Sequence, residues 1–121
     1  MRSRRHDDVD LERDRALVER CQAGDSSAFD DLYLRYRERL FRSCLRRTGN
    51  TSEAEDLVQE TFVRAWKAMP TFAGERRFYH WLSVIANNLC ADLARRGGRC
   101  VPVEEKALDL IAPAVAAEQE A

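Results

Sequence analysis

Apolar residues recur at helical spacing in four stretches of this 121-residue chain, and this periodicity restricts the fold more than any other feature. Residues three, four and seven positions apart lie on one face of an α-helix, so each stretch predicts an amphipathic helix. The stretches cover about residues 11–21, 26–48, 52–69 and 77–96. With five Gly and three Pro, the chain has too few turn residues for a β-sandwich or barrel. We therefore predict an all-α fold, a compact bundle of about four helices followed by a flexible linker.

The ends of the chain differ in composition from its middle. We predict a flexible N-terminal segment over residues 1–10, a helical domain over 11–97 and an acidic, Ala-rich linker over 98–121. The basic start leads into acidic residues instead of an apolar signal core, and no apolar run reaches the roughly 18–20 residues that cross a bilayer. A cytoplasmic protein with no membrane partner is the resulting expectation.

Charge is distributed unevenly although the net charge is only −1. Residues 35–47 contain six arginines against one glutamate, and the stretch from Cys100 onward contains five acidic residues against one lysine. Arginine is suited to planar contacts with phosphates and bases. The alternative is that these arginines lie on solvated helix faces and pair with acids one turn away.

Residues for catalysis or metal binding do not cluster in the sequence. The four cysteines, at positions 21, 44, 90 and 100, form no C-x-x-C pair, and the two histidines are isolated. We expect reduced thiols packed mostly in the core. Because no nucleophile, base and orienting group occur at useful spacing, we predict no enzyme, no catalytic residues, no metal and no cofactor.

The third helix has one apolar side and one polar side. Ser52 and Glu55 have the form of a capping box at its start. A spacing of about 100° per residue assigns the core side to Ala54, Leu57, Val58, Thr61, Phe62, Ala65 and Met69. The opposite side holds Asp56, Gln59, Glu60, Val63 and Lys67. That side is either a solvated face with one tolerated valine or a docking surface for another protein.

The fourth helix carries small and amide side chains on its predicted outer face, which are His80, Ser83, Val84, Asn87, Asn88, Ala91 and Arg95. Amides can pair with base edges, and arginines near the helix end can neutralise phosphates. Such a face is suited either to water or to nucleic acid.

The loop before this helix interleaves aromatic residues, a glycine and two arginines between Pro70 and Tyr79. This composition is typical of loops that hold unpaired bases beside a basic surface. The alternative is a plain connector in which Phe72 fills the core.

The order and spacing of several motifs between Leu17 and Arg96 resemble region 2 of bacterial sigma factors, specifically the extracytoplasmic-function group of the sigma-70 family. The motifs are Val18-Glu19-Arg20-Cys21-Gln22-Ala23-Gly24-Asp25, Ala28-Phe29, Leu32-Tyr33, Gly49, Glu55-Asp56-Leu57-Val58-Gln59-Glu60-Thr61-Phe62, Ala65-Trp66, Phe78, Trp81-Leu82, Ile85-Ala86 and Asn88. About 80 residues are covered by the resemblance. "AEDLVQETF" is a strong motif on its own, and the full set in this order is very specific.

The resemblance implies a domain that binds the RNA polymerase core and that recognises and melts the −10 promoter element. It implies contact with the coiled coil of the polymerase clamp through Asp56, Gln59, Glu60, Val63 and Arg64. It also implies binding of the non-template single strand by the loop and the fourth helix, and hence by Thr71, Phe72, Ala73, Gly74, Glu75, Arg76, Arg77, Tyr79, His80, Ser83, Val84, Asn87, Asn88 and Arg95. An anti-sigma factor is a further expected partner.

Two features depart from the family pattern. The chain ends at Ala121 without the helix-turn-helix domain, region 4, that reads the −35 element, which fits an isolated region 2 or a specialised member of the family. Asn87 also replaces a basic or larger residue, and Arg76-Arg77 replace small polar residues. The rival hypothesis is a helical interaction module, bound by an anti-sigma protein, that lacks useful DNA affinity.

Overall fold

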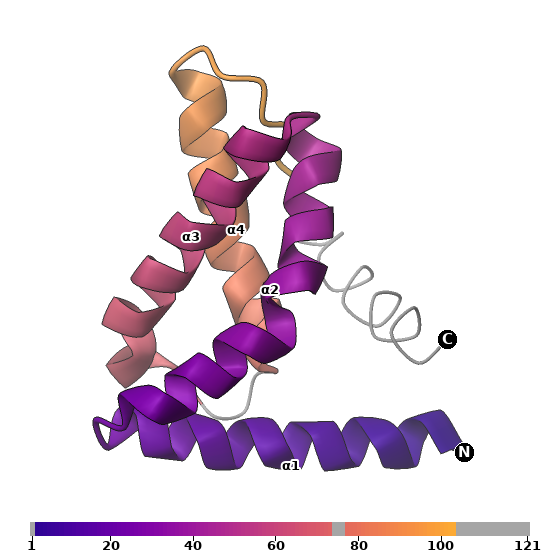
Figure 1. The fold of residues 1–121 in the computed structure, drawn as a ribbon, viewed down its shortest axis with the longest axis vertical. Coiled ribbons are helices and arrows are strands. Elements are labelled where there is room, and N and C mark those ends of the chain that lie inside the picture. The colour runs from indigo at the N-terminus through magenta and orange to yellow at the C-terminus, as the bar shows by residue number, and fades with distance from the viewer. Residues whose placement is uncertain (1, 74–76, 104–121) are drawn as a thin grey trace.

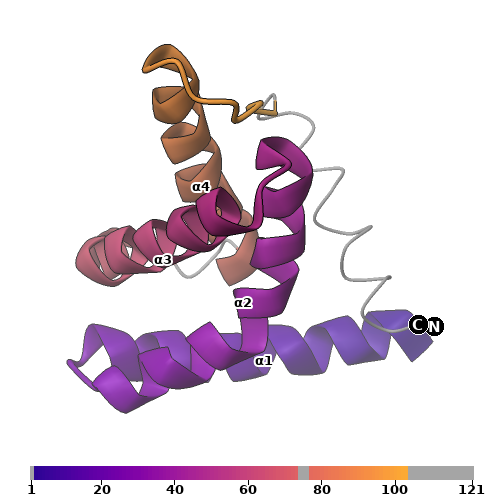
Figure 2. The same ribbon diagram turned by 45° about the horizontal axis from the view of Figure 1, so that its top comes forward.

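Four α-helices and one 3₁₀ turn make up the computed structural model, which describes residues 2–73 and 77–103. The elements are α1 (Arg2–Gln22), α2 (Ser26–Thr48), α3 (Thr51–Ala68), η1 (Met69–Thr71) and α4 (Phe78–Arg95). In Figure 1, α1 lies across one end of the group formed by α2, α3 and α4, and Figure 2 shows the same arrangement from a second direction. The predicted all-α bundle of about four helices is confirmed.

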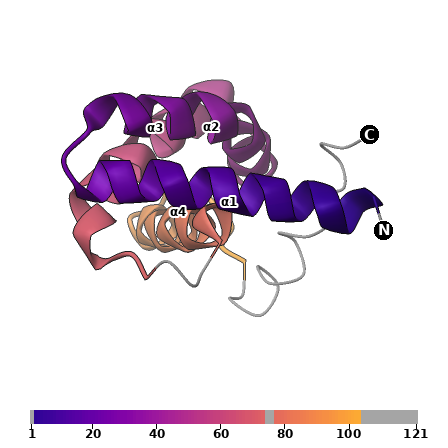
Figure 3. The same ribbon diagram turned by 90° about the horizontal axis from the view of Figure 1, so that it is seen from below.

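The first helix begins earlier than the sequence predicted. We expected a flexible segment over residues 1–10 and a helix start near Leu11, but α1 already begins at Arg2. No Gly or Pro interrupts the chain before Gly24, so nothing in the sequence stops the helix from continuing toward the N-terminus. The N-terminal part of α1 extends past the other helices in Figure 3.

Side-chain caps define the junctions around α2 and α3. The Asp25 carboxylate accepts a hydrogen bond from the Ser27 backbone N–H at 3.0 Å and begins α2. The Asn50 Oδ1 atom accepts the Glu53 N–H at 2.9 Å and begins α3. The predicted cap at Ser52 is therefore wrong. Asn50 is in the extended conformation directly after the end of α2, so α3 starts before Ser52, which lies inside the first turn.

The core lies between α2, α3 and α4. The side of α3 that periodicity assigned to the core is fully buried, from Ala54 to Met69. Leu32 and Leu40 of α2 and Leu82 and Ala86 of α4 are at most 1% exposed. Helical spacing alone therefore identified the interior correctly for α3.

Two arginines of α2 are buried, although the sequence placed the arginines of this helix on its solvated side. Arg39 is 7% exposed and Arg47 is 9% exposed. The Arg39 guanidinium carbon lies 4.2 Å from the centre of the Tyr79 ring, so a cation–π contact partly replaces its hydration. Burial lowers the pKa of Arg47. These contacts come from α4 packing beside α2, which the sequence of α2 does not reveal.

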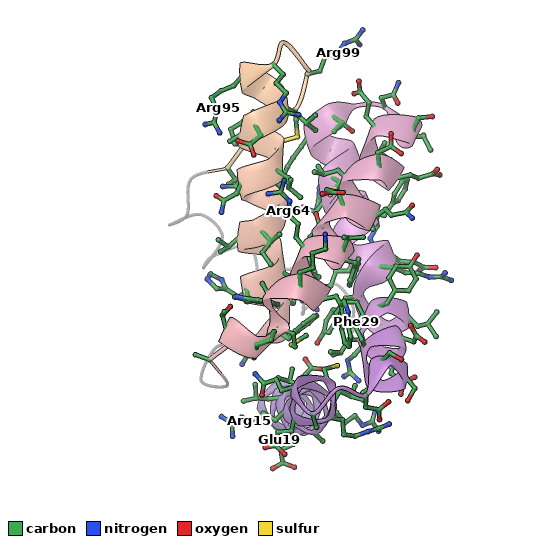
Figure 4. All side chains as sticks on the ribbon, turned by 90° about the vertical axis from the view of Figure 1, so that its left-hand side faces the viewer. Arg15, Glu19, Phe29, Arg64, Arg95 and Arg99 are labelled. Atoms are coloured by element: carbon green, nitrogen blue, oxygen red, sulfur yellow. A yellow bond between two sulfur atoms is a disulfide. The ribbon has the colours of Figure 1, made fainter. Side chains whose placement is uncertain are left out.

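The cysteines are in two different states. Cys21 and Cys44 are free and buried, as expected of core thiols. Cys90 of α4 and Cys100 form a disulfide, visible in Figure 4, so the prediction of four reduced thiols is wrong for this pair. No local pattern predicts this disulfide, because the two residues are ten positions apart and meet only after the chain turns back at the end of α4.

Candidate functional site

The outer face of α3 is open to solvent at all five positions that the resemblance linked to polymerase. Asp56, Gln59, Glu60, Val63 and Arg64 are exposed. Val63, at 41% exposure, is an apolar residue on an otherwise polar surface. The Arg64 Nε atom lies 3.4 Å from the Glu60 Oε1 atom, an ion pair across one helical turn. This pair is exposed, so it contributes little to stability and leaves both groups available to a partner.

On one flank, the α3 face continues into a groove against α4. The groove encloses about 290 Å³. Its lining consists of Asp56, Leu57, Glu60, Arg64, Leu89, Asp92, Leu93 and Arg96. Figure 4 shows Arg64 between the two helices. Sequence reasoning treated each helix separately and so missed that Asp92 and Leu93 join the α3 surface.

On the other flank, the α3 face borders aromatic residues shared with α2. Trp66 lies one turn beyond Val63 and is 38% exposed, and Tyr33 of α2 is 37% exposed. The Phe29 ring lies 5.1 Å from the Trp66 ring, centre to centre. Val63 is therefore next to an aromatic flank, whereas leucines and charged residues together line the groove on the other flank.

The loop after α3 is only partly available for binding. Thr71, Ala73 and Arg77 are exposed, whereas Phe72 is 6% exposed. The Phe72 ring packs edge-on against the Trp81 ring at 4.8 Å, so Phe72 fills the core. The packing interpretation of Phe72 is confirmed, and its contact with a base stays a prediction. The expected site residues Gly74, Glu75 and Arg76 lie outside the described residues.

Gln22, at the end of α1, holds the start of this loop. Its Nε2 atom donates hydrogen bonds to the backbone carbonyl of Met69 at 3.1 Å and to that of Phe72 at 3.0 Å. The Thr71 hydroxyl also donates to the Ala68 carbonyl at 2.6 Å. The sequence predicts no role for Gln22 beyond its place in a family motif. Its role depends on α1 meeting η1, 47 residues further along the chain.

The predicted outer face of α4 is divided in the structure. Asn88 and Arg95 are exposed, and His80, Val84 and Ala91 are half-buried. The prediction of Ser83 and Asn87 as solvent-facing residues is wrong, because each is 7% exposed, and Tyr79, another expected DNA contact, is 5% exposed.

Each of the three buried residues on α4 has partners within the protein. Tyr79 lies against Arg39. The Ser83 hydroxyl donates to the Tyr79 carbonyl at 2.8 Å. The Asn87 Nδ2 donates to the Val103 carbonyl at 2.6 Å, and the Val103 N–H donates to the Asn87 Oδ1 at 2.7 Å. Asn87 therefore faces the returning chain, and Tyr79 faces α2, instead of solvent.

Cations cluster near the C-terminal end of α4. Arg95, Arg96 and Arg99 are exposed, and Arg95 forms an ion pair with Asp92. Figure 4 shows Arg95 and Arg99 pointing away from the bundle. Within residues 2–73 and 77–103, no three His, Cys, Asp or Glu side chains are grouped for a metal ion. None of the helices in this part of the chain is long and apolar enough to cross a membrane.

Residues 32–100 match the family described as Sigma-70 region 2. The chain belongs to that family. Several of its relatives are named extracytoplasmic-function (ECF) sigma factors, which confirms the resemblance seen in the sequence. The RNA polymerase sigma-H factor of Pseudomonas aeruginosa is 42% identical over 89 residues, which are 73% of this chain and 46% of the relative. The ECF RNA polymerase sigma factor BldN of Streptomyces coelicolor is 45% identical over 86 residues, 70% of this chain and 33% of the relative.

A solved structure also resembles this sigma region 2 chain. An NMR structure of an engineered region 2 of sigmaE, in complex with GTAAAA, has a TM-score of 0.60 and 36% sequence identity. The match covers 69% of this chain and 90% of the other. The chain thus spans less than half the length of the two curated relatives but most of one isolated region 2 domain.

Proposed function

We propose that this sigma region 2 domain binds the RNA polymerase core and recognises and melts the −10 promoter element. The observation that carries the proposal is its likeness to the engineered region 2 of sigmaE, which was solved with the oligonucleotide GTAAAA. The exposed loop residues Thr71, Ala73 and Arg77, and the exposed part of α4, support the same function here.

Melting follows from capture of an unpaired base. A base inside a duplex is inaccessible to a pocket, so a loop that holds an extruded base stabilises the open form. Unstacking costs a few kcal/mol, which binding energy must supply. Arg77 and the arginines near the end of α4 would add phosphate contacts along the single strand. No nucleotide hydrolysis is needed for this mechanism.

Polymerase binding is assigned to the exposed face of α3. Asp56, Gln59 and Glu60 provide hydrogen-bonding groups, and Val63 provides an apolar contact at the centre of the face. An interface with an apolar centre and a polar rim is the usual form of a protein docking surface. The coiled coil of the polymerase clamp is the partner that we propose for this face.

The second candidate is an interaction module that is held by an anti-sigma factor and has no useful DNA affinity. The burial of Phe72, Tyr79, Ser83 and Asn87 favours it, because four of the expected DNA contacts are already used inside the protein. The α3 face would then serve a regulatory protein instead of, or in addition to, polymerase.

Fluorescence anisotropy separates the two candidates. A labelled GTAAAA strand and a scrambled strand of the same composition are titrated with the domain, alone and bound to core polymerase. The promoter-binding proposal predicts tighter binding of one ordered strand, with the preference retained on polymerase. The interaction module would be favoured if the domain bound both strands with equal affinity, alone and on polymerase, and if no strand from a random pool bound more tightly than these.

A further inference from the structure

A short segment after α4 is bound back onto the bundle by a disulfide and three hydrogen bonds. We call residues 100–103 the strap. Cys100 is joined to Cys90, and the Val101 N–H donates to the Arg47 carbonyl at 3.2 Å. Val103 exchanges two backbone hydrogen bonds with the Asn87 amide. The strap therefore links α4 to the C-terminal end of α2, as the path of the chain in Figure 1 shows.

Two glycines make this return of the chain possible. Gly97 has a φ of +89°, and its N–H donates to the Ala94 carbonyl at 3.2 Å. The Gly98 N–H donates to the Leu93 carbonyl at 2.8 Å, which completes a Schellman motif at the end of α4. A Cβ atom on Gly98 would lie 2.9 Å from the Leu93 carbonyl oxygen, so this position also requires glycine. The turn is built to direct the strap back along the helix.

The strap covers the side chain of Asn87, which would be accessible to a ligand on an uncovered α4. The Asn87 amide has one donor group and one acceptor atom, and both are paired with the Val103 backbone. The same pair of groups is what an asparagine presents to the edge of an adenine base. While the strap is bound, Asn87 cannot make such a contact. Asn88, the next residue, is exposed and unaffected.

From this juxtaposition we propose that the Cys90–Cys100 disulfide is a redox switch that closes the strap over Asn87 and so limits the nucleic-acid surface of α4. The proposal rests on the proposed DNA-binding function and adds its regulation. In the oxidised protein Asn87 is covered. In the reduced protein the strap is held only by its hydrogen bonds and by the packing of Cys100, so it opens and exposes the amide to single-stranded DNA.

The chemistry is an exchange between the disulfide and a dithiol reductant. A thiolate of the reductant attacks one sulfur, breaks the Cys90–Cys100 bond and forms a mixed disulfide with the protein. The second thiol of the reductant then attacks the mixed disulfide and releases the protein thiol. Cys90 and Cys100 together gain two electrons and two protons, and the reductant leaves as a disulfide. Both sulfur-bearing residues are buried, so the strap must open locally before the attack.

The other two cysteines are poor participants in this exchange. Cys21 and Cys44 are buried, and burial raises the pKa of each thiol to about 11. The reactive species is the thiolate, which is scarce for such groups at neutral pH. Reduction and reoxidation of the domain should therefore involve Cys90 and Cys100 only.

Strap opening is measured first, without DNA. Amide hydrogen exchange is followed at Val101 and Val103 in the oxidised protein, in the protein reduced with dithiothreitol, and in a Cys100→Ser variant. Cys100→Ser removes the disulfide but keeps Cys90 in its buried site, and circular dichroism checks the fold. We expect at least about tenfold faster exchange at both amides in the reduced and variant proteins. Unchanged protection in both would overturn the proposal.

DNA binding is then compared in the two redox states with the labelled strand that the domain prefers. Release of Asn87 should tighten binding by at least about fivefold, the lower end of what one amide–base contact contributes. Asn87→Ala should abolish this difference, and Asn88→Ala, the matched control, should preserve it. Equal affinity of both redox states for a strand that the domain does bind would overturn the switch. If neither redox state preferred any strand over its scrambled counterpart, the proposed promoter function would be overturned, and with it the regulatory role. The hydrogen-exchange data would then still show whether reduction opens the strap.

Discussion

The helices α3 and α4 lie side by side but differ in how many of their sides are covered. α3 buries a single stripe from Ala54 to Met69 and leaves the opposite side exposed, including Gln59 and Val63. α4 is covered a second time by α2 and by the strap, which bury Tyr79 and Asn87. The surface of α3 is thus available to a partner as it stands, whereas part of the α4 surface is already bound by the protein itself.

This difference between α3 and α4 explains in which cases helical periodicity predicts the exposure of a residue correctly. Periodicity reports the side of a helix that faces the shared core, and it is reliable where all packing neighbours lie on that side, as α2 and α4 do for α3. A segment that covers a second side of a helix leaves no trace in the local pattern. Asn87 reads as solvent-facing in the sequence because its partner, Val103, is 16 residues away.

The largest expected effect is the difference in stability between substitutions on the buried and the exposed side of α3. Phe62→Ala, which empties a position only 4% exposed, should lower the free energy of unfolding by about 3–5 kcal/mol. Val63→Ala, one residue later on the exposed side, should change it by within about 0.5 kcal/mol. Urea unfolding of both variants measures the contrast. Similar losses in the two would mean that the assigned orientation of α3 is wrong.

A smaller contrast is expected between adjacent residues of α4. Asn87→Ala removes both side-chain partners of the Val103 backbone and should cost about 1–3 kcal/mol of stability. Asn88→Ala, at an exposed position, should cost no more than about 0.5 kcal/mol. Thermal unfolding of oxidised protein tests this. If Asn87→Ala proved as mild as Asn88→Ala, the two hydrogen bonds between Asn87 and Val103 would contribute nothing to the stability of the fold.

Gln22 connects α1 to the loop, so its removal should act on both stability and loop order. Gln22→Ala leaves the Met69 and Phe72 carbonyls without this donor and should cost about 0.5–1.5 kcal/mol. Glu19→Ala, on an exposed side chain that points away from the bundle in Figure 4, is the matched control. NMR chemical shifts of Thr71 and Phe72 should move in the first variant only. Unmoved loop shifts in Gln22→Ala would remove its positioning role.

The smallest change in stability is expected for the α3 face, together with a loss of binding. Gln59→Ala should alter the free energy of unfolding by within about 0.5 kcal/mol but weaken capture of core polymerase. Lys67→Ala tests the far end of the same face, and Glu19→Ala again serves as control. Pull-down of core polymerase alongside melting curves measures both properties. Full polymerase binding by Gln59→Ala would move the docking surface elsewhere.

Much of the fold could be read from the sequence because it depends on local signals. Asp25 caps the start of α2 and Gly49 caps its end, each through contacts within a few residues. The buried stripe of α3 follows from the spacing of the apolar residues in that helix. The true cap of α3, Asn50, was missed because Ser52 and Glu55 offered a competing local pattern. Local sequence patterns limit the N-cap to a few candidate residues, and the position at which the preceding helix ends determines which candidate forms the cap.

The candidate site was predictable only where it does not depend on distant contacts. Positions on the α3 face were placed correctly on the surface, and Arg77 and Asn88 are exposed as expected. The Gln22 bonds to the loop and the contact of Arg39 with Tyr79 join elements far apart in the sequence. The disulfide joins two cysteines ten positions apart that meet only because the chain turns back after α4. None of these could be inferred from spacing, because each requires the tertiary arrangement of the helices.

The most direct test of DNA recognition is the salt dependence of binding to a labelled −10 non-template strand. For the wild type we predict preference for one strand over a scrambled one, with affinity falling as salt rises. Arg77→Ala should flatten the slope of log affinity against log salt by about 0.7, the share of one phosphate on a single strand, and keep the preference. An unchanged slope in Arg77→Ala, together with equal affinity of the wild type for ordered and scrambled strands, would contradict the account.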